Sequence, residues 1–117
     1  MNPRDGSVAT NFNGSVAGTI AAVSSFDKNC LTHIIVGNTT AAIAYLQIFN
    51  KVSTAVTVGT TAPDMVVMVP IGGSVAIEFD KPIKMFDAAG LSCACTTARA
   101  GATGATCEVN IGYLGGS

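Results

Sequence analysis

The sequence predicts an all-β domain, an antiparallel β-sandwich built from about eight short strands. Three observations lead to this fold class. Runs of roughly five to eight residues, rich in β-branched side chains, recur along the chain. Gly, Pro, Asn or Asp residues separate these runs, and no stretch has a clear helical periodicity. Eight strands suit a jelly roll and seven suit an immunoglobulin-like sandwich, so both topologies stay open.

The first residues differ in composition from the rest of the chain. Residues 1–13 combine Asn, Pro, Asp, Gly and Ser with few large apolar side chains, which predicts a flexible N-terminal arm. Residues 14–117 then form a single domain, because the chain of 117 residues is too short for two cores. The first strand is expected over Val16–Val23, where Gly18 interrupts the run.

Two strands are expected in the next part of the chain. Cys30–Val36 alternates in side-chain type and stops at Gly37-Asn38. Ala42–Asn50 is apolar on both faces, which indicates a central strand covered on both sides. A helix capped by Thr39-Thr40 is the competing interpretation. Ile, Tyr and Phe side chains favour the strand.

A hairpin is the most distinct local pattern. Met65–Val69 ends at Pro70, and Gly72-Gly73 supplies the backbone freedom of a tight turn. Ser74–Phe79 then alternates, with Val75, Ile77 and Phe79 on the inward side. We therefore expect Met65–Val69 to pair with Ser74–Phe79.

Three further strands complete the prediction. A short piece, Ile83–Phe86, precedes a strand over Leu91–Thr96. A loop rich in Ala, Gly and Thr spans Thr97–Thr106, and the last strand covers Cys107–Leu114.

Charge is scarce in this chain. Six basic and seven acidic residues are scattered singly and give a net charge of −1, so no basic stripe suited to nucleic acid exists. The longest apolar runs fall far short of the ~20 residues that a membrane-spanning helix needs. The polar first residues do not resemble a signal peptide, so synthesis in the cytoplasm is expected. Contiguous Thr, Ala and Val on so uncharged a surface predict association with other copies or partners.

Four cysteines allow two disulfides, and the sequence does not choose among the three possible connectivities. Cys93 and Cys95 lie one residue apart, so on a strand they share a face and are poorly placed to pair with each other. In a reducing cytoplasm we expect Cys30, Cys93, Cys95 and Cys107 to remain free thiols and to behave as small buried apolar groups.

No catalytic or metal-binding pattern stands out. His33 is the only histidine, and neither Cys30 nor the Cys93-Ala94-Cys95 spacing matches a zinc site. His33 also lacks an accompanying nucleophile motif, so a packed or hydrogen-bonded strand histidine is the better interpretation. Glu78, Asp80 and Asp87 are interleaved with lysines, as in a solvated loop. We expect neither an enzyme nor a cofactor.

Short motifs between Leu31 and Tyr113 resemble a group of small all-β proteins of tailed bacteriophages, virion components of the capsid decoration, or cement, type. The matching segments are Asn38, Tyr45 to Lys51, Val58-Gly59-Thr60 with Pro63, Val69-Pro70, Gly73-Ser74 and Gly90-Leu91-Ser92. The N-terminal residues and the cluster of Cys93, Cys95 and Cys107 are not part of the resemblance.

The resemblance implies a β-sandwich subunit on the outside of a capsid, commonly a homotrimer bound to the major capsid protein lattice. It implies no catalytic residues. We expect the protein to stabilise an icosahedral phage head, with partner contacts made by residues of the arm: Asn2, Arg4, Asp5, Asn11 and Phe12. The alternative is a tail or fibre accessory that recognises host surface glycans, although the absence of Trp and the presence of only two Tyr leave it few aromatic platforms.

Overall fold

The computed structural model describes residues 8–24, 29–85 and 90–115. Over these residues the chain forms eight strands and one short 3₁₀ helix. The elements are β1 (Val8–Val16), β2 (Ala21–Ser24), β3 (Asn29–Asn38), β4 (Ala44–Phe49), η2 (Ser53–Ala55), β5 (Met65–Val69), β6 (Ser74–Met85), β7 (Leu91–Thr96) and β8 (Cys107–Gly115).

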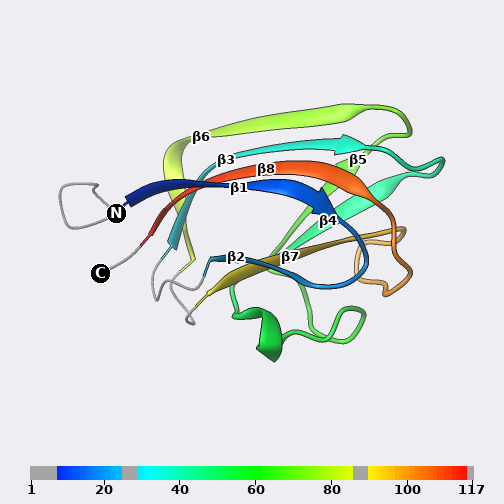
Figure 1. Cartoon of the computed structure of the whole chain (residues 1–117), viewed down its shortest axis with the longest axis horizontal. Helices are drawn as coiled ribbons and strands as arrows, with labels where there is room; N and C mark the ends of the chain where they lie inside the picture. Colours follow the sequence, from blue (N-terminus) through cyan, green and yellow to red (C-terminus); the bar gives the residue numbers. More distant parts are fainter. Residues whose placement is uncertain (1–7, 25–28, 86–89, 116–117) are drawn as a thin grey trace.

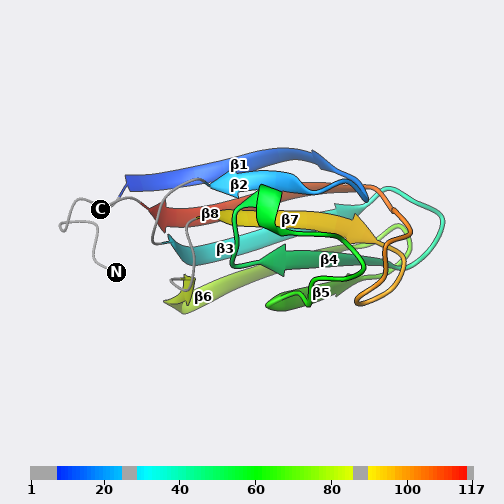
Figure 2. The same ribbon diagram turned by 90° about the horizontal axis from the view of Figure 1, so that it is seen from below.

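The strands form two four-stranded sheets packed face to face (Figure 1). Sheet A has the order β1-β8-β3-β6, and sheet B has the order β2-β7-β4-β5. All of the pairings are antiparallel. Figure 2 shows both sheets together, with β1 beside β2 at one edge of the sandwich and β6 beside β5 at the other.

This strand order decides the topology. The first strand pairs with the last, and chain neighbours such as β1 and β2, β3 and β4 or β5 and β6 lie in opposite sheets. Eight strands in two such interleaved Greek keys are a jelly roll, whereas the immunoglobulin order keeps neighbouring strands A and B in one sheet. The predicted all-β sandwich is confirmed, and the topology left open by the sequence is the jelly roll.

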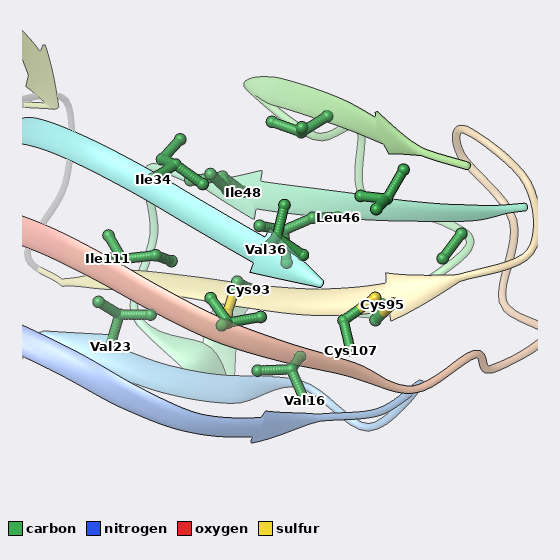
Figure 3. Close-up of a cluster of buried hydrophobic side chains, with 14 of the residues drawn as sticks. Val16, Val23, Ile34, Val36, Leu46, Ile48, Cys93, Cys95, Cys107 and Ile111 are labelled. Carbon is green, nitrogen blue, oxygen red and sulfur yellow. The ribbon is translucent and has the colours of Figure 1, made fainter. Parts of the chain in front are cut away.

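The core lies between the two sheets, where alternate side chains of every strand meet (Figure 3). Leu46 and Ile48 of β4 face Ile34 and Val36 of β3, and all four are fully buried. Each such side chain contributes about 1.5–3 kcal/mol by leaving water. The predicted strand over Ala42–Asn50 is confirmed as a central strand, since β4 lies between β7 and β5.

Loops cover the outer face of sheet B over β4 and β7, whereas Met68 of β5 stays exposed. Phe49, Val56 and Ala94 form a second buried cluster, where the segment that carries η2 packs over β4 and β7 (Figure 2). The amide nitrogen of Gln47 donates to Oγ1 of Thr96 at 2.7 Å and to the carbonyl oxygen of Gly101 at 3.1 Å. The outer face of sheet A has no such cover among the described residues.

Asn38 fastens the corner at which β3 ends. Its Nδ2 donates to the carbonyl oxygen of Ala42 at 2.6 Å. The same group lies 3.2 Å from the carbonyl oxygen of Val69 and 3.3 Å from that of Pro70. Its Oδ1 accepts hydrogen bonds from the backbone nitrogen and the hydroxyl of Thr40. One side chain thus ties together the end of β3, the start of β4 and the turn after β5.

The predicted hairpin of Met65–Val69 with Ser74–Phe79 is wrong. A turn does form, since the backbone nitrogen of Gly73 donates to the carbonyl oxygen of Pro70 at 3.0 Å and Gly72 adopts a φ of 66°. The two strands then diverge, because β5 pairs with β4 in sheet B and β6 pairs with β3 in sheet A. The turn thus carries the chain from one sheet to the other, so Val69 of β5 and Val75 of β6 reach the same core from opposite sides.

The predicted boundary of the N-terminal arm is also wrong for residues 8–13. These residues belong to β1, which pairs along its whole length with β8, from Val8 opposite Gly115 to Val16 opposite Cys107. The strand expected over Val16–Val23 is instead the crossing from sheet A to sheet B, with β1 ending at Val16 and β2 starting at Ala21. Residues 1–7 lie outside the described residues.

The C-terminal predictions hold with one change. Leu91–Thr96 is β7, and Cys107–Leu114 falls within β8. The predicted pieces Ser74–Phe79 and Ile83–Phe86 are joined into one strand, β6, as far as Met85. Its pairing with β3 jumps at this point, since Leu31 lies opposite Ile83 and His33 lies opposite Glu78.

Candidate functional site

The candidate site is the outer face of sheet A, called here the open face. Three rows of side chains cross it, one residue from each strand in the order β1, β8, β3, β6, as fixed by the strand register. The rows are Asn11, Gly112, His33, Glu78; then Asn13, Asn110, Ile35, Ala76; then Ser15, Glu108, Gly37, Ser74. Small and polar residues dominate these rows. The side chains therefore project little from the sheet and offer hydrogen-bonding groups rather than a large apolar surface.

A hydrogen-bonded pair marks the middle of this face. Nε2 of His33 lies 2.7 Å from Oδ1 of Asn110. An amide oxygen only accepts, so the imidazole donates from Nε2. The ring lies over the backbone of β8, because a Cβ added to Gly112 would stand 2.3 Å from Cε1 of His33 and 2.4 Å from Nδ1. Gly112 therefore makes the space in which the ring rests.

Ile35 is the apolar centre of the open face, with 47% of its surface exposed. A depression of about 410 Å³ lies on one side of it, lined by His33, Ala76 and Glu78 among others. A shallower one of about 240 Å³ lies on the other side, between Ile35, Asn13 and Glu108. An exposed aliphatic side chain between two hollows is a shape that a complementary protein surface can cover.

Within the three rows, the charge comes from Glu78 and Glu108, both exposed. Carboxylates repel phosphate, so the face is unsuited to a nucleic-acid backbone and suits a partner that presents amides, hydroxyls or single cations. Hydrogen bonding and shape are what this arrangement supplies.

The predicted partner-binding residues fall into two groups. Asn2, Arg4 and Asp5 lie outside the described residues. Asn11 and Phe12 lie in β1 and separate there, because neighbours on a strand face opposite ways. Asn11 is exposed and stands in the first row of the open face, whereas Phe12 turns inward and packs against the core.

The other residues singled out from the sequence are placed as follows. All four cysteines are buried and free, as expected. Glu78 and Asp80 lie on strand β6 rather than in a loop, and Asp87 is outside the described residues. In the part of the chain that the structure describes, no group of three or more His, Cys, Asp and Glu side chains is placed to hold a metal ion. No helix in that part is long and apolar enough to cross a membrane.

Sequence reasoning missed the open face as a unit. His33 was interpreted as a packed or hydrogen-bonded strand residue, which is confirmed, but its partner Asn110 is 77 residues away. The usable signal was the alternation of residue types: in Cys107–Leu114 the polar or small residues Glu108, Asn110 and Gly112 alternate with apolar ones. Such alternation predicts a solvent-facing side without saying which strands share it.

Several residues that carry the phage resemblance hold corners of the fold. Asn38 ties the β3 corner, as described above. Gly59 and Gly90 adopt φ angles of 93° and 102°, which strongly favour glycine. A Cβ at Gly90 would also stand 2.7 Å from the Cα of Val52.

No protein-family model matches the sequence, and no curated protein matches it. Solved structures share the sandwich at low similarity. A chain of Bacillus endospore appendages, a family of disulfide-linked pili, is 12% identical with a TM-score of 0.41, over 95% of this chain and 91% of that one. Aeromonas hydrophila PliG, a periplasmic lysozyme inhibitor, is 12% identical with a TM-score of 0.39, over 93% and 89%.

A chain of the cyanophage Pam1 capsid asymmetric unit is 14% identical with a TM-score of 0.34, over 92% of this chain and 85% of that one. These distant matches are β-sandwich proteins of diverse kinds, and one of them is a phage capsid component. At such scores the likeness concerns the fold alone.

Proposed function

We propose that this chain is a capsid decoration protein, which binds the outside of an icosahedral bacteriophage head and stabilises it. The observation that carries the proposal is the open face: loops cover β4 and β7 of sheet B, whereas sheet A presents a broad, weakly charged surface around Ile35. The sequence resemblance between Leu31 and Tyr113 supports the same role.

The mechanism is mass action. A protein that binds the assembled head and not the free capsid subunits lowers the free energy of the head alone. Each contact through the open face is modest, because it rests on Asn and Ser side chains around one aliphatic centre. Many copies, joined to one another, convert modest contacts into persistent attachment.

The proposal also gives a role to the residues that precede β1. Val8 lies opposite Gly115, so residues before Val8 join the domain at the Gly115 end of sheet A. In this proposal Asn2, Arg4 and Asp5 contact neighbouring subunits from that end, and Asn11 contributes from within the open face.

A homotrimer is the proposed form of the subunit. Strands β1, β2 and β5 lie at sheet edges and carry no charged side chain over their lengths. Uncharged edges favour association between copies. Light scattering of the purified chain tests this part: a discrete trimer is expected, and a monomer at micromolar concentration would contradict it.

Co-sedimentation with undecorated, expanded heads of the encoding phage tests the function. Near-stoichiometric binding that saturates is expected. The matched variants are Ile35→Glu on the open face and Val52→Glu in the segment that precedes η2, whose side chains are 47% and 39% exposed. A carboxylate at position 35 places an unpaired charge in the interface and weakens binding by tenfold or more, as an order-of-magnitude expectation.

Val52→Glu leaves head binding within about twofold on the same reasoning, since it lies on the sheet B side, away from the open face. Circular dichroism melts of both variants check that the fold survives. Failure of the unmodified protein to sediment with heads contradicts the function. Normal binding by Ile35→Glu contradicts the assignment of the face.

A glycan-binding tail or fibre accessory is the second candidate. The hollow of about 410 Å³ beside His33 and Glu78 favours it, since side chains of this kind hydrogen-bond sugar hydroxyls. A glycan array separates the two roles: a sugar bound by the unmodified chain and lost in Glu78→Gln would support the second candidate, and silence across the array would remove it.

A further inference from the structure

Two cysteine side chains from opposite sheets meet inside the core. Cys95 lies near the end of β7 and Cys107 begins β8, and Figure 3 shows their sulfur-bearing side chains directed toward each other. The backbone holds them together. Thr96 forms a bridge with Gly104, and the backbone nitrogen of Ala105 donates to the carbonyl oxygen of Cys95 at 3.0 Å. Cys107 follows two residues later.

The two thiols are in direct contact. The S–H of Cys95 donates a hydrogen bond to the sulfur of Cys107, which raises the pKa of Cys95 and lowers that of Cys107. Cys107 is therefore the better nucleophile of the pair, and Cys95 is the neighbour placed to react with it in a second step.

We propose that Cys95 and Cys107 form an intramolecular disulfide that joins sheet A to sheet B when the folded protein meets a peroxide. This assignment concerns the chain itself and does not depend on head binding.

The chemistry balances with hydrogen peroxide as the two-electron oxidant. The Cys107 thiolate attacks one peroxide oxygen, the O–O bond breaks, and the departing hydroxide takes up the thiol proton to leave as water, which gives a sulfenic acid. The Cys95 sulfur then attacks the sulfur of that sulfenic acid, and hydroxide leaves with the Cys95 proton as a second water. Two thiols and one peroxide become one disulfide and two waters.

The other two cysteines are placed less well. Cys30 lies opposite Leu114 on β8, while Cys107 lies opposite Asn38, so Cys30 and Cys107 are eight residues apart along β3, roughly 25 Å. Cys93 shares the inward face of β7 with Cys95, one pleat further from the Thr96 bridge. Burial, with a smaller contribution from Cys107, raises the pKa of Cys93 to about 12 and keeps it a thiol.

Tryptic mapping of the full chain reads the linkage directly. Cleavage after Lys84 and Arg99 separates residues 85–99, which hold Cys93 and Cys95, from residues 100–117, which hold Cys107. Cys30 falls in a third peptide. After hydrogen peroxide treatment of the folded protein, we expect the first two peptides joined, with the loss of two hydrogens and no intermolecular dimer.

Alanine variants assign the partners. Cys95→Ala and Cys107→Ala abolish the linkage, whereas the matched controls Cys93→Ala and Cys30→Ala retain it. The cross-link also raises the melting temperature of the unmodified protein and of both controls by an amount on the order of 10 °C, because it restrains the unfolded chain. Cys95→Ala and Cys107→Ala show no such rise, which separates the linkage from a general effect of removing a core thiol.

Three results would overturn the proposal. The first is a linkage through Cys93 or Cys30, and the second is a disulfide between two chains. The third is a folded chain that keeps all its thiols under peroxide conditions that oxidise the urea-unfolded chain.

Discussion

The space that Gly112 leaves for the imidazole of His33 gives a sharp test of the open face. Replacing Gly112 with Ala introduces a methyl group 2.3 Å from Cε1 and 2.4 Å from Nδ1 of His33, and 2.7 Å from Oγ1 of Thr32. Real contacts of this kind are longer than 3.0 Å. The ring must therefore leave its place over β8, and the 2.7 Å hydrogen bond to Asn110 breaks.

The expected loss follows from these contacts. A partly buried hydrogen bond contributes about 0.5–1.5 kcal/mol to the free energy of unfolding. Crowding of the new methyl group adds about 1 kcal/mol more, at the lower end of what overpacked sites show. Gly112→Ala should thus lower the free energy of unfolding by about 2 kcal/mol, measured by urea denaturation followed by circular dichroism.

A double-mutant cycle isolates the contact. In His33→Ala the hydrogen bond is already absent, and the two shortest clashes disappear. Adding Gly112→Ala to this variant should therefore lower the free energy of unfolding by about 1 kcal/mol less than it does in the unmodified chain. Gly37→Ala is the matched control on the same face, because a Cβ there meets nothing within 4 Å. Gly37→Ala should raise the free energy of unfolding by no more than about 1 kcal/mol.

The reasoning fails if Gly112→Ala and Gly37→Ala unfold at the same urea concentration. It also fails if the cycle shows additive effects, because His33 would then not occupy the space above Gly112.

Three further outcomes follow from buried polar groups. Asn38→Ala should lower the free energy of unfolding by about 2–3 kcal/mol in urea titration, because the β3 corner loses its shared side chain, while exposed Asn13→Ala stays within about 0.5 kcal/mol. Tyr113→Phe removes the buried hydroxyl that donates to the carbonyl oxygen of Val23 at 3.0 Å and should cost about 1 kcal/mol in the same assay. The pKa of Cys93, raised from 9.0 to about 12, means that above pH 9 the unfolded chain releases this proton while the folded chain keeps it. Stability should therefore fall from pH 9 toward pH 12, and Cys93→Ala should flatten the fall by up to about 1.4 kcal/mol per pH unit.

Local pattern was enough to predict most strands. Val75, Ile77 and Phe79 alternate with exposed residues as the sequence indicates, and all three pack against the core. The apolar faces of Ala42–Asn50 likewise predicted a central strand, because burial on both sides leaves little room for polar residues.

Choice of sheet was not predictable in the same way. Pro70 and Gly72-Gly73 predict a turn, and the turn forms, but they do not say that Val75 lies opposite Val36, on the other sheet from Val69. β1 was missed because its Asn, Gly and Ser residues resemble an arm. Its pairing with β8 joins the two ends of the domain, and nothing within residues 8–16 signals a partner so distant in sequence.

Hydrogen–deuterium exchange of the protein free and bound to heads tests the central claim most directly. The account predicts slower exchange on binding in β1 and in residues 74–78 of β6, the edges of the open face, with β5 unchanged. Unaltered exchange in the presence of heads, or protection confined to β4 and β5, would contradict it.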